Sequence, residues 1–203
     1  MRGDDPWERG AAIERAYAET VTHSGGIAMP LCAATGNTKG TKAPMMTTVD
    51  GLKIAPDFLL VRRGRTLWAE VKGKCQPSYH FKSGRWEHGL DWHLVAHYSA
   101  VQRESGAPVW IVVHEAHSPA SDDIRPRWAW RHMTPMPCCT PSGLWLCVSL
   151  DDAMASGGRR AEWPNGRGGR YGQGGLLWPR AIMRKRGEVP TTAHPVDEVA
   201  NPL

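Results

Sequence analysis

Apolar residues recur at helical spacing in two separate stretches of the chain. The first begins at DPWE (residues 5–8), which offers a capping aspartate, a first-turn proline and a capping-box glutamate. It ends at Gly25–Gly26, and its apolar face is formed by Ile13, Ala16, Tyr17 and Val21. The second ends near Gly106, and its apolar side is formed by Leu90, Leu94, Val95, Tyr98 and Val101. We therefore expect two helices.

Runs of adjacent apolar residues predict strands between and after these helices. The runs DFLLV (57–61) and TLWAEVKG (66–73) are joined by the short turn RRGR, which favours an antiparallel hairpin. APVWIVVHE (107–115) predicts a central strand, and IAMPLCAAT (27–35) a short edge strand because it contains a proline. Weaker signals predict strands at 144–150 and 174–183, a short helix at 150–156, and loops at 36–44 and 75–89.

The order of the clearest elements is helix, hairpin, helix and strand. This order indicates an α/β fold with a central mixed sheet flanked by helices. The chain has 203 residues, 41% of them hydrophobic, which suits one domain with a sizeable core. We predict a single domain over residues 1–185, with its core at 7–115 and a less regular extension at 116–185. The segment 186–203 has little that can pack and is predicted to be disordered.

The chain carries a modest excess of positive charge, concentrated near its end. The formal net charge is +5 and the pI is about 9.1. Between Gly157 and Arg186 a single acid, Glu162, opposes a basic set formed by Arg159, Arg160, Arg167, Arg170, Arg180, Arg184, Lys185 and Arg186. This segment suits either contact with nucleic-acid phosphates or a solvated surface.

Neither a membrane segment nor a disulfide framework is predicted. No apolar run approaches the roughly 20 residues that cross a bilayer, and the N-terminus lacks the apolar segment of a secretory signal. We expect a cytoplasmic protein of a bacterial or phage-infected host cell. The five cysteines are odd in number and form no CxxC pair, so free thiols are the simplest interpretation. A zinc site of cysteines and histidines stays an alternative, although the spacing is unlike a ribbon or finger.

Two carboxylates and a lysine interrupt the apolar hairpin. If it turns about Arg63–Gly64, Asp57 lies directly opposite Glu70, with Cβ atoms about 5 Å apart and both side chains on one face. Lys72, two residues beyond Glu70, shares that face. The group is either a structural ion pair or a cation site, and the cost of burying such charges favours the cation. Carboxylates on two strands suit Mg²⁺ or Mn²⁺.

These residues resemble a known motif. APD at 55–57, twelve intervening residues and EVK at 70–72 are similar to the signature of the PD-(D/E)xK nuclease superfamily. The helix–hairpin–helix–strand order is also that of its restriction-endonuclease-like core, and the resemblance covers roughly residues 7–115. The segment GAAIERAYAE (10–19) resembles the first helix of archaeal-type Holliday junction resolvases within this superfamily.

The resemblance implies metal-dependent hydrolysis of phosphodiester bonds in DNA. Asp57, Glu70 and the Val71 carbonyl would hold Mg²⁺, for which Mn²⁺ would substitute. Lys72 would orient the attacking water or neutralise the negative charge that develops during the reaction.

Two further catalytic candidates lie on the predicted helices. Glu14 on the first helix would support a second metal ion, with Glu19 as the alternative. Gln102 on the second helix is the other candidate, because several superfamily members place a Gln or Tyr there near the metal. Either residue is equally compatible with an ordinary helix surface.

The loops on both sides of the hairpin contain candidate contacts with DNA phosphates. The basic residues are Lys39, Lys42, Lys74, Lys82 and Arg85. Interleaved aromatic residues suit either stacking on unpaired bases or packing in the core, namely Tyr79, Phe81 and Trp86. The nearby histidines are interpreted as helix-surface or phosphate-contacting residues rather than a zinc site: His80, His88, His93 and His97.

The predicted function is that of a Mg²⁺-dependent endonuclease, resembling a Holliday junction resolvase in recombination or repair. A two-fold homodimer would match the two symmetric cleavage sites of branched DNA. A restriction-like or end-processing nuclease is the alternative enzyme. An inactive DNA-binding protein is the alternative from another class, and the intact set of Asp57, Glu70 and Lys72 argues against it.

Overall fold

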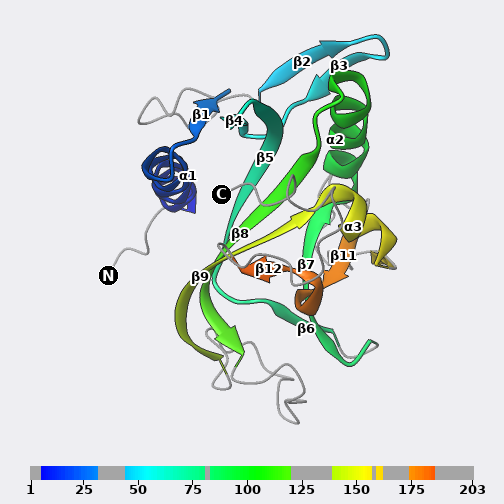
Figure 1. Ribbon diagram of the computed structural model, residues 1–203. Coiled ribbons are helices and arrows are strands. Elements are labelled where there is room, and N and C mark those ends of the chain that lie inside the picture. Colours follow the sequence, from blue (N-terminus) through cyan, green and yellow to red (C-terminus); the bar gives the residue numbers. More distant parts are fainter. Residues whose placement is uncertain are drawn as a thin grey trace.

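A six-stranded mixed sheet forms the centre of the described part of the molecule (Figure 1). The computed structural model describes residues 6–31, 44–80, 83–119, 139–156, 159–161 and 174–185. Only β5 and β8 run parallel within this sheet, and its other neighbours are antiparallel. Its strands, in spatial order, are β1 (Ile27–Pro30), β4 (Phe58–Arg62), β5 (Arg65–Lys74), β8 (Val109–Pro119), β9 (Cys139–Ser149) and β12 (Arg184–Lys185). The predicted α/β class with a central mixed sheet is confirmed.

A second, four-stranded sheet contains a segment that we predicted to be a loop. Its order is β10 (Arg159–Ala161), β11 (Gly175–Pro179), β7 (Arg85–Asp91) and β6 (Ser78–His80). The loop prediction for 75–89 is therefore wrong. The short, charged sequence of β6 and β7 gives little local strand signal, and β7 is stabilised by pairing with β11, which is distant in sequence. A separate pair, β2 (Met45–Thr48) and β3 (Gly51–Ile54), was not predicted either.

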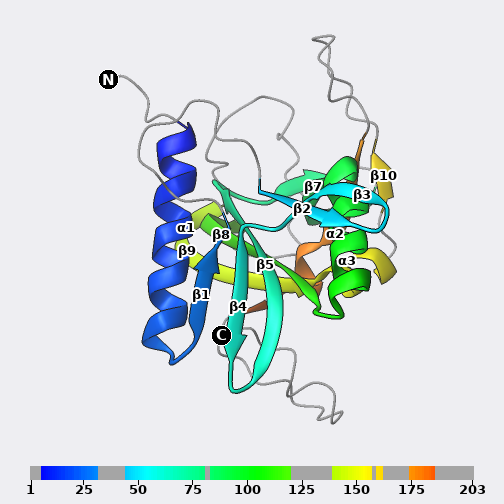
Figure 2. The same cartoon turned by 90° about the horizontal axis from the view of Figure 1, so that it is seen from above.

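Helices cover the two faces of the central sheet (Figure 2). On one face, α1 (Pro6–His23) places Tyr17 and Val21 against apolar residues of β4, β5 and β8. On the other face, α2 (Trp92–Ser105) and α3 (Leu150–Ala155) share a core with the four-stranded sheet. A short 3₁₀ helix, η1 (Arg180–Ile182), follows β11. The C-terminal ends of both helices are as predicted: Gly25 and Gly106 adopt φ of 80° and 67°, where glycine is favoured. The predicted start of the second helix is wrong, because Leu90 lies in β7 and pairs with Leu176.

The β4–β5 hairpin has the predicted register. Arg63 and Gly64 both have positive φ, 48° and 75°, which is the backbone of a two-residue type I′ turn. Pairing continues to Phe58 opposite Ala69, so the next positions along the two strands are Asp57 and Glu70. The hairpin sequence thus sets the geometry of the candidate site.

Strand β1 lies at one edge of the six-stranded sheet, where Pro30 predicted it. The amide of Leu31 donates to the Asp57 carbonyl, so Leu31 faces β4 and its neighbour Pro30 faces outward. Pro30 has no N–H group, and this side of the strand therefore lacks one hydrogen-bond donor. No helix of the described residues is long and apolar enough to span a membrane.

Several predicted features fall outside the described residues. They include most of the 36–44 loop and the predicted tail at 186–203. Strands from the predicted extension do pair with the core: β9 lies beside β8, and β11 lies beside β7.

Candidate active site

Asp57 lies where β4 and β5 stop pairing. Its Oδ2 atom accepts a hydrogen bond of 2.8 Å from the backbone N–H of Val71. Because the N–H and C=O of a strand residue point to the same side, the Val71 carbonyl also faces the Asp57 side of β5. The last pair of the ladder, Phe58 with Ala69, leaves this carbonyl beyond the paired region. One carboxylate and one carbonyl oxygen therefore belong to the same small region.

Glu70 is the most deeply buried acid of this region. Glu70 is 2% exposed, and the other buried residues of β5 are apolar. Its Oε1 forms an ion pair with Lys72 Nζ, as strand alternation predicted. Its Oε2 is buried and has no hydrogen-bond partner among the described residues. An unpartnered carboxylate oxygen in an apolar interior is costly unless another ligand completes its shell.

The charges of this group shift one another's protonation. Burial, and next the charge of Glu70, raises the pKa of Asp57 well above its usual value. Burial disfavours the charged form of Lys72, but Glu70 and Asp57 outweigh it and raise the pKa of Lys72. Acidic side chains therefore outnumber the one lysine in this group, and carboxylates this close repel one another unless a positive charge or a proton lies between them.

Glu14 approaches the same group from α1. Burial raises the pKa of Glu14, and the next largest cause is the charge of Glu70. Ile13 of α1 packs over Gly73, where a Cβ atom would lie 2.3 Å from Ile13 Cδ1. The missing side chain lets α1 lie close to β5 at this point. Glu19, the alternative candidate, is exposed on the same helix.

Tyr98 of α2 closes the group from the other side of the sheet. It is 1% exposed, and burial followed by the charge of Glu70 strongly raises its pKa, so it stays a neutral phenol. In the sequence it was named as an apolar helix residue one turn before Gln102, on the helix where several superfamily members place a Gln or Tyr near the metal. Its position near Glu70 depends on the packing of α2 in the core cluster that includes Trp68 of β5, and periodicity alone does not predict that packing.

Gln102 makes hydrogen bonds of a structural kind. Its Nε2 donates to Asp151 Oδ1 at 2.9 Å, and its Oε1 accepts from the Val109 backbone at 2.8 Å. The side chain thereby ties the end of α2 to the starts of β8 and α3. Its catalytic role stays a prediction.

The five basic residues predicted to contact DNA differ in their surroundings. Lys39, Lys42 and Lys82 lie outside the described residues. Lys74 lies near the candidate site: partial burial and the charge of Lys72 lower its pKa, and Asp91 opposes that shift. The Arg85 side chain is about half exposed and forms an ion pair with Glu87, at 3.2 Å.

Other residues singled out in the sequence turn out to be buried. Trp86 is 2% exposed and packs edge-on against Tyr79, so it is not available for base stacking. His88 is 3% exposed and contacts Glu115, which corrects the expectation of a surface histidine. Arg180 also binds Glu115, so it does not belong to a phosphate-binding surface. The described cysteines with resolved side chains, Cys75 and Cys147, are free thiols.

Side chains supply only some of the possible metal ligands at this site. Among the described residues, no group of three or more His, Cys, Asp or Glu side chains is arranged to hold a metal ion. Asp57, Glu70 and the Val71 carbonyl provide two carboxylates and one backbone oxygen instead. Mg²⁺ commonly takes one or two carboxylates and keeps several waters, so this set, with its unpartnered Glu70 oxygen, fits such an ion.

Comparisons with known proteins give little more. No protein-family model matches the sequence, and no curated protein matches it. Among solved structures, the chain is similar to Hjc of Archaeoglobus fulgidus, a Holliday junction resolvase from an archaeal hyperthermophile. The two chains are 13% identical, the match covers 85% of this chain and 89% of that one, and the TM-score is 0.44. So distant a likeness identifies no activity, and we argue function from the residues of this chain.

Proposed function

We propose that this protein is a divalent-metal-dependent endodeoxyribonuclease. The observation that carries the proposal is the convergence of Asp57, Glu70 and Lys72 at the end of one hairpin, with Glu70 Oε2 left unpartnered. The same three residues carry the resemblance to PD-(D/E)xK nucleases in the sequence. Motif and geometry are separate lines of support, because the motif says nothing about burial or partners.

Each residue of the site has a role in this reaction. Asp57, Glu70 and the Val71 carbonyl would hold Mg²⁺, with Mn²⁺ as a substitute. An ion bound there lowers the pKa of a coordinated water and stabilises negative charge on a phosphate. Lys72 is held in its charged form by its acidic neighbours and is placed to neutralise charge that develops on the scissile phosphate.

Glu14 extends the site toward α1. Its position near Glu70 and Lys72 supports a role in a second metal position or in orienting the attacking water. Tyr98 contributes a neutral hydroxyl beside Glu70 and excludes solvent from that carboxylate.

Branched DNA is the substrate that we propose. The support comes from the first helix, whose GAAIER segment resembles that of archaeal-type junction resolvases. A four-way junction has two symmetric cleavage positions, so we also propose a two-fold homodimer.

Cleavage by single-site variants tests the enzyme proposal. With Mg²⁺, Asp57→Ala, Glu70→Ala and Lys72→Ala should each abolish cleavage while circular dichroism shows an unchanged fold. Glu14→Gln and Glu19→Gln form a matched pair on one helix, and only the first should slow the reaction. Full activity of Glu70→Ala would sink the assignment.

A panel of DNA shapes tests the substrate proposal. Four-way junctions, flaps, linear duplexes and single strands are compared at equal concentration with Mg²⁺, and junctions should be cut fastest. Equal cleavage of linear duplex would favour a restriction-like enzyme, and binding without cleavage an inactive DNA-binding protein.

A further inference from the structure

The turn of the β4–β5 hairpin concentrates positive charge at one end of the molecule. Arg62, Arg63 and Arg65 lie within four residues, and the segment 58–69 contains no acid. Arg63 and Arg65 are exposed, and Arg62 is partly exposed. None of the three forms an ion pair with a residue that the structure describes. In Figure 2 the hairpin tip lies at the end of the molecule, past the turn that joins α1 to β1.

Arg63 occupies a backbone position that arginine does not favour. Its φ is 48°, and it is the one residue other than glycine with positive φ among the described residues. Type I′ turns usually place Asn, Asp or Gly at this position, because a Cβ atom is strained there. A cation at this position therefore has no explanation in the folding of the turn, whereas a function of the side chain would explain it.

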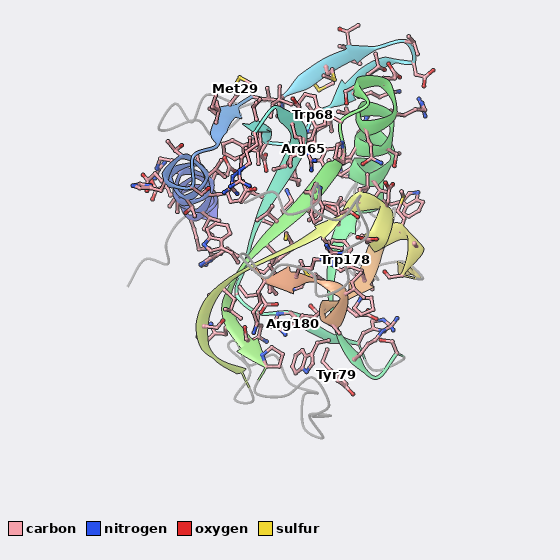
Figure 3. The ribbon with its side chains drawn as sticks, viewed as in Figure 1. Met29, Arg65, Trp68, Tyr79, Trp178 and Arg180 are labelled. Carbon is pink, nitrogen blue, oxygen red and sulfur yellow. The ribbon has the colours of Figure 1, made fainter. Side chains whose placement is uncertain are left out.

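The scaffold holds these three arginines in a fixed arrangement. Strands β4 and β5 pair up to Arg62 and Arg65, so the residues on both sides of the turn are fixed in the central sheet. Arg65, labelled in Figure 3, opens β5. The five paired residues of β4 separate the tip from the candidate active site by about 17 Å, at about 3.3 Å per residue. Duplex DNA carries one phosphate per strand about every 3.4 Å along its axis, so a duplex of a few base pairs is as long as this separation.

We propose that the turn Arg62–Arg65 is a second contact surface for nucleic acid, which binds backbone phosphates outside the cleavage site. This rests on the proposed function for the identity of the polyanion. Guanidinium groups bind phosphate oxygens in pairs and read no sequence, so the surface increases affinity and fixes the DNA relative to Glu70 without selecting a base sequence.

Replacement of Arg63 by glycine separates binding from folding. Arg63→Gly removes one charge and suits the positive φ, so thermal unfolding should show an unchanged or higher Tm. Arg62→Gln and Arg65→Gln, combined with it, remove the whole surface. The matched control is Arg103→Gln, because Arg103 is an exposed arginine whose partner, Asp50, is also exposed.

Binding is measured by fluorescence anisotropy with a labelled 30-base-pair duplex in EDTA, so that no cleavage occurs. At about 50 mM salt each removed phosphate contact should weaken binding on the order of tenfold, and reduce the slope of log K against log salt by about 0.9. Arg103→Gln should change neither quantity appreciably.

The outcomes distinguish this inference from the proposed function. In one outcome, the wild type binds DNA in a salt-dependent way, the arginine variants lose this binding, and the wild type cleaves no DNA. This outcome supports the inference and contradicts the proposed nuclease activity. Cleavage by the wild type with unchanged DNA binding of the triple variant overturns the inference alone. Unchanged DNA binding together with lost binding to anionic lipid vesicles would also overturn it.

Discussion

Two buried glutamates on neighbouring strands of the central sheet have opposite surroundings. Glu115 of β8 is 0% exposed, and both of its oxygens are satisfied. Its Oε1 contacts His88 Nε2 at 2.5 Å and Arg180 Nε at 2.9 Å, and its Oε2 accepts from Ser118 Oγ at 2.8 Å. Glu70 of β5 is 2% exposed, has Lys72 on one oxygen and has no described partner on the other.

The difference separates a structural charge from one that is suited to bind something. Burial alone would raise the pKa of Glu115, but hydrogen bonds from His88 and Arg180 outweigh it and lower that pKa. At Asp57, beside Glu70, burial and repulsion raise the pKa instead. A fully satisfied polar network makes the fold more rigid, and an unpaired buried polar atom is costly. The Glu115 network joins the two sheets, whereas the Glu70 group has the unpaired oxygen at which we propose that a cation binds.

Removal of the satisfied carboxylate should have the largest effect on stability. Glu115→Ala removes the carboxylate that the buried His88 and the partly buried Arg180 share, and we expect a loss of about 3–5 kcal/mol in the free energy of unfolding. Urea denaturation measures this value. The exposed Glu19→Ala should stay within about 0.5 kcal/mol of the wild type. If Glu115→Ala lowers the free energy of unfolding no more than Glu19→Ala does, the Glu115 network does not stabilise the fold.

Filling the gap between α1 and β5 should have the next largest effect. Gly73→Val introduces a side chain where Ile13 already lies, and overpacking of this kind costs about 1–3 kcal/mol. Cleavage should also slow, because displacement of α1 moves Glu14 away from Glu70. The double variant Gly73→Val with Ile13→Ala should recover part of both losses, and purely additive effects would contradict direct contact.

The two glutamate groups should respond to pH with opposite sign. The folded pKa of Glu115 is lowered, so its stabilisation is present above the unfolded pKa and is lost as pH falls through the folded pKa. The folded pKa of Asp57 is raised, so the stability of the fold is highest below the unfolded pKa and falls as pH rises through the folded pKa. Asp57→Asn, whose amide oxygen still accepts from Val71, should therefore raise Tm at neutral pH and less so near pH 4.

The control for this prediction is the matching amide at the other site. Glu115→Gln should lower Tm at neutral pH, and the deficit should shrink in acid. Differential scanning calorimetry of both variants across the pH range measures the two trends. If the Tm of both variants, relative to the wild type, changes with pH in the same direction, the two groups do not differ in the way proposed.

Binding of a metal ion should have the smallest effect on stability, and this effect should require the Glu70 group. If the ion binds the native site, a concentration ten times its Kd raises the free energy of unfolding by about 1.4 kcal/mol. Mg²⁺ should thus raise the Tm of the wild type and of Arg103→Gln, but not that of Glu70→Gln. An equal rise in Glu70→Gln would place the ion elsewhere.

Local signals predicted the Glu70 region well and the Glu115 region not at all. The turn at Arg63–Gly64 and the alternation of β5 fix the register, so the placement of Asp57 opposite Glu70 follows from a stretch of fourteen positions along the chain. His88 and Arg180 are 27 and 65 residues from Glu115. Periodicity carries no information on such contacts, and His88 and Arg180 were interpreted as surface residues for that reason.

The same limit explains the errors at β6 and β7. Their strand character depends on β11, and a buried Glu87 within β7 contradicts the hydrophobic pattern of an ordinary strand. Ser83 donates to Glu87 Oε1 at 2.7 Å and Arg85 pairs with the same oxygen, whereas Glu87 Oε2 has no hydrogen-bond partner among the described residues. Catalytic roles for Gln102 and Glu14 remain predictions that cleavage assays decide.

The proline at the edge of β1 bears on how two copies associate. A sheet grows across a molecular boundary when both edges offer alternating donors and acceptors. On the outward side of β1, Ala28 offers an N–H and Pro30 offers none, so a second chain gains few main-chain bonds there. A two-fold contact made through the β1 edge would therefore depend on side chains, and its stability would respond to surface substitutions at that edge rather than to main-chain pairing.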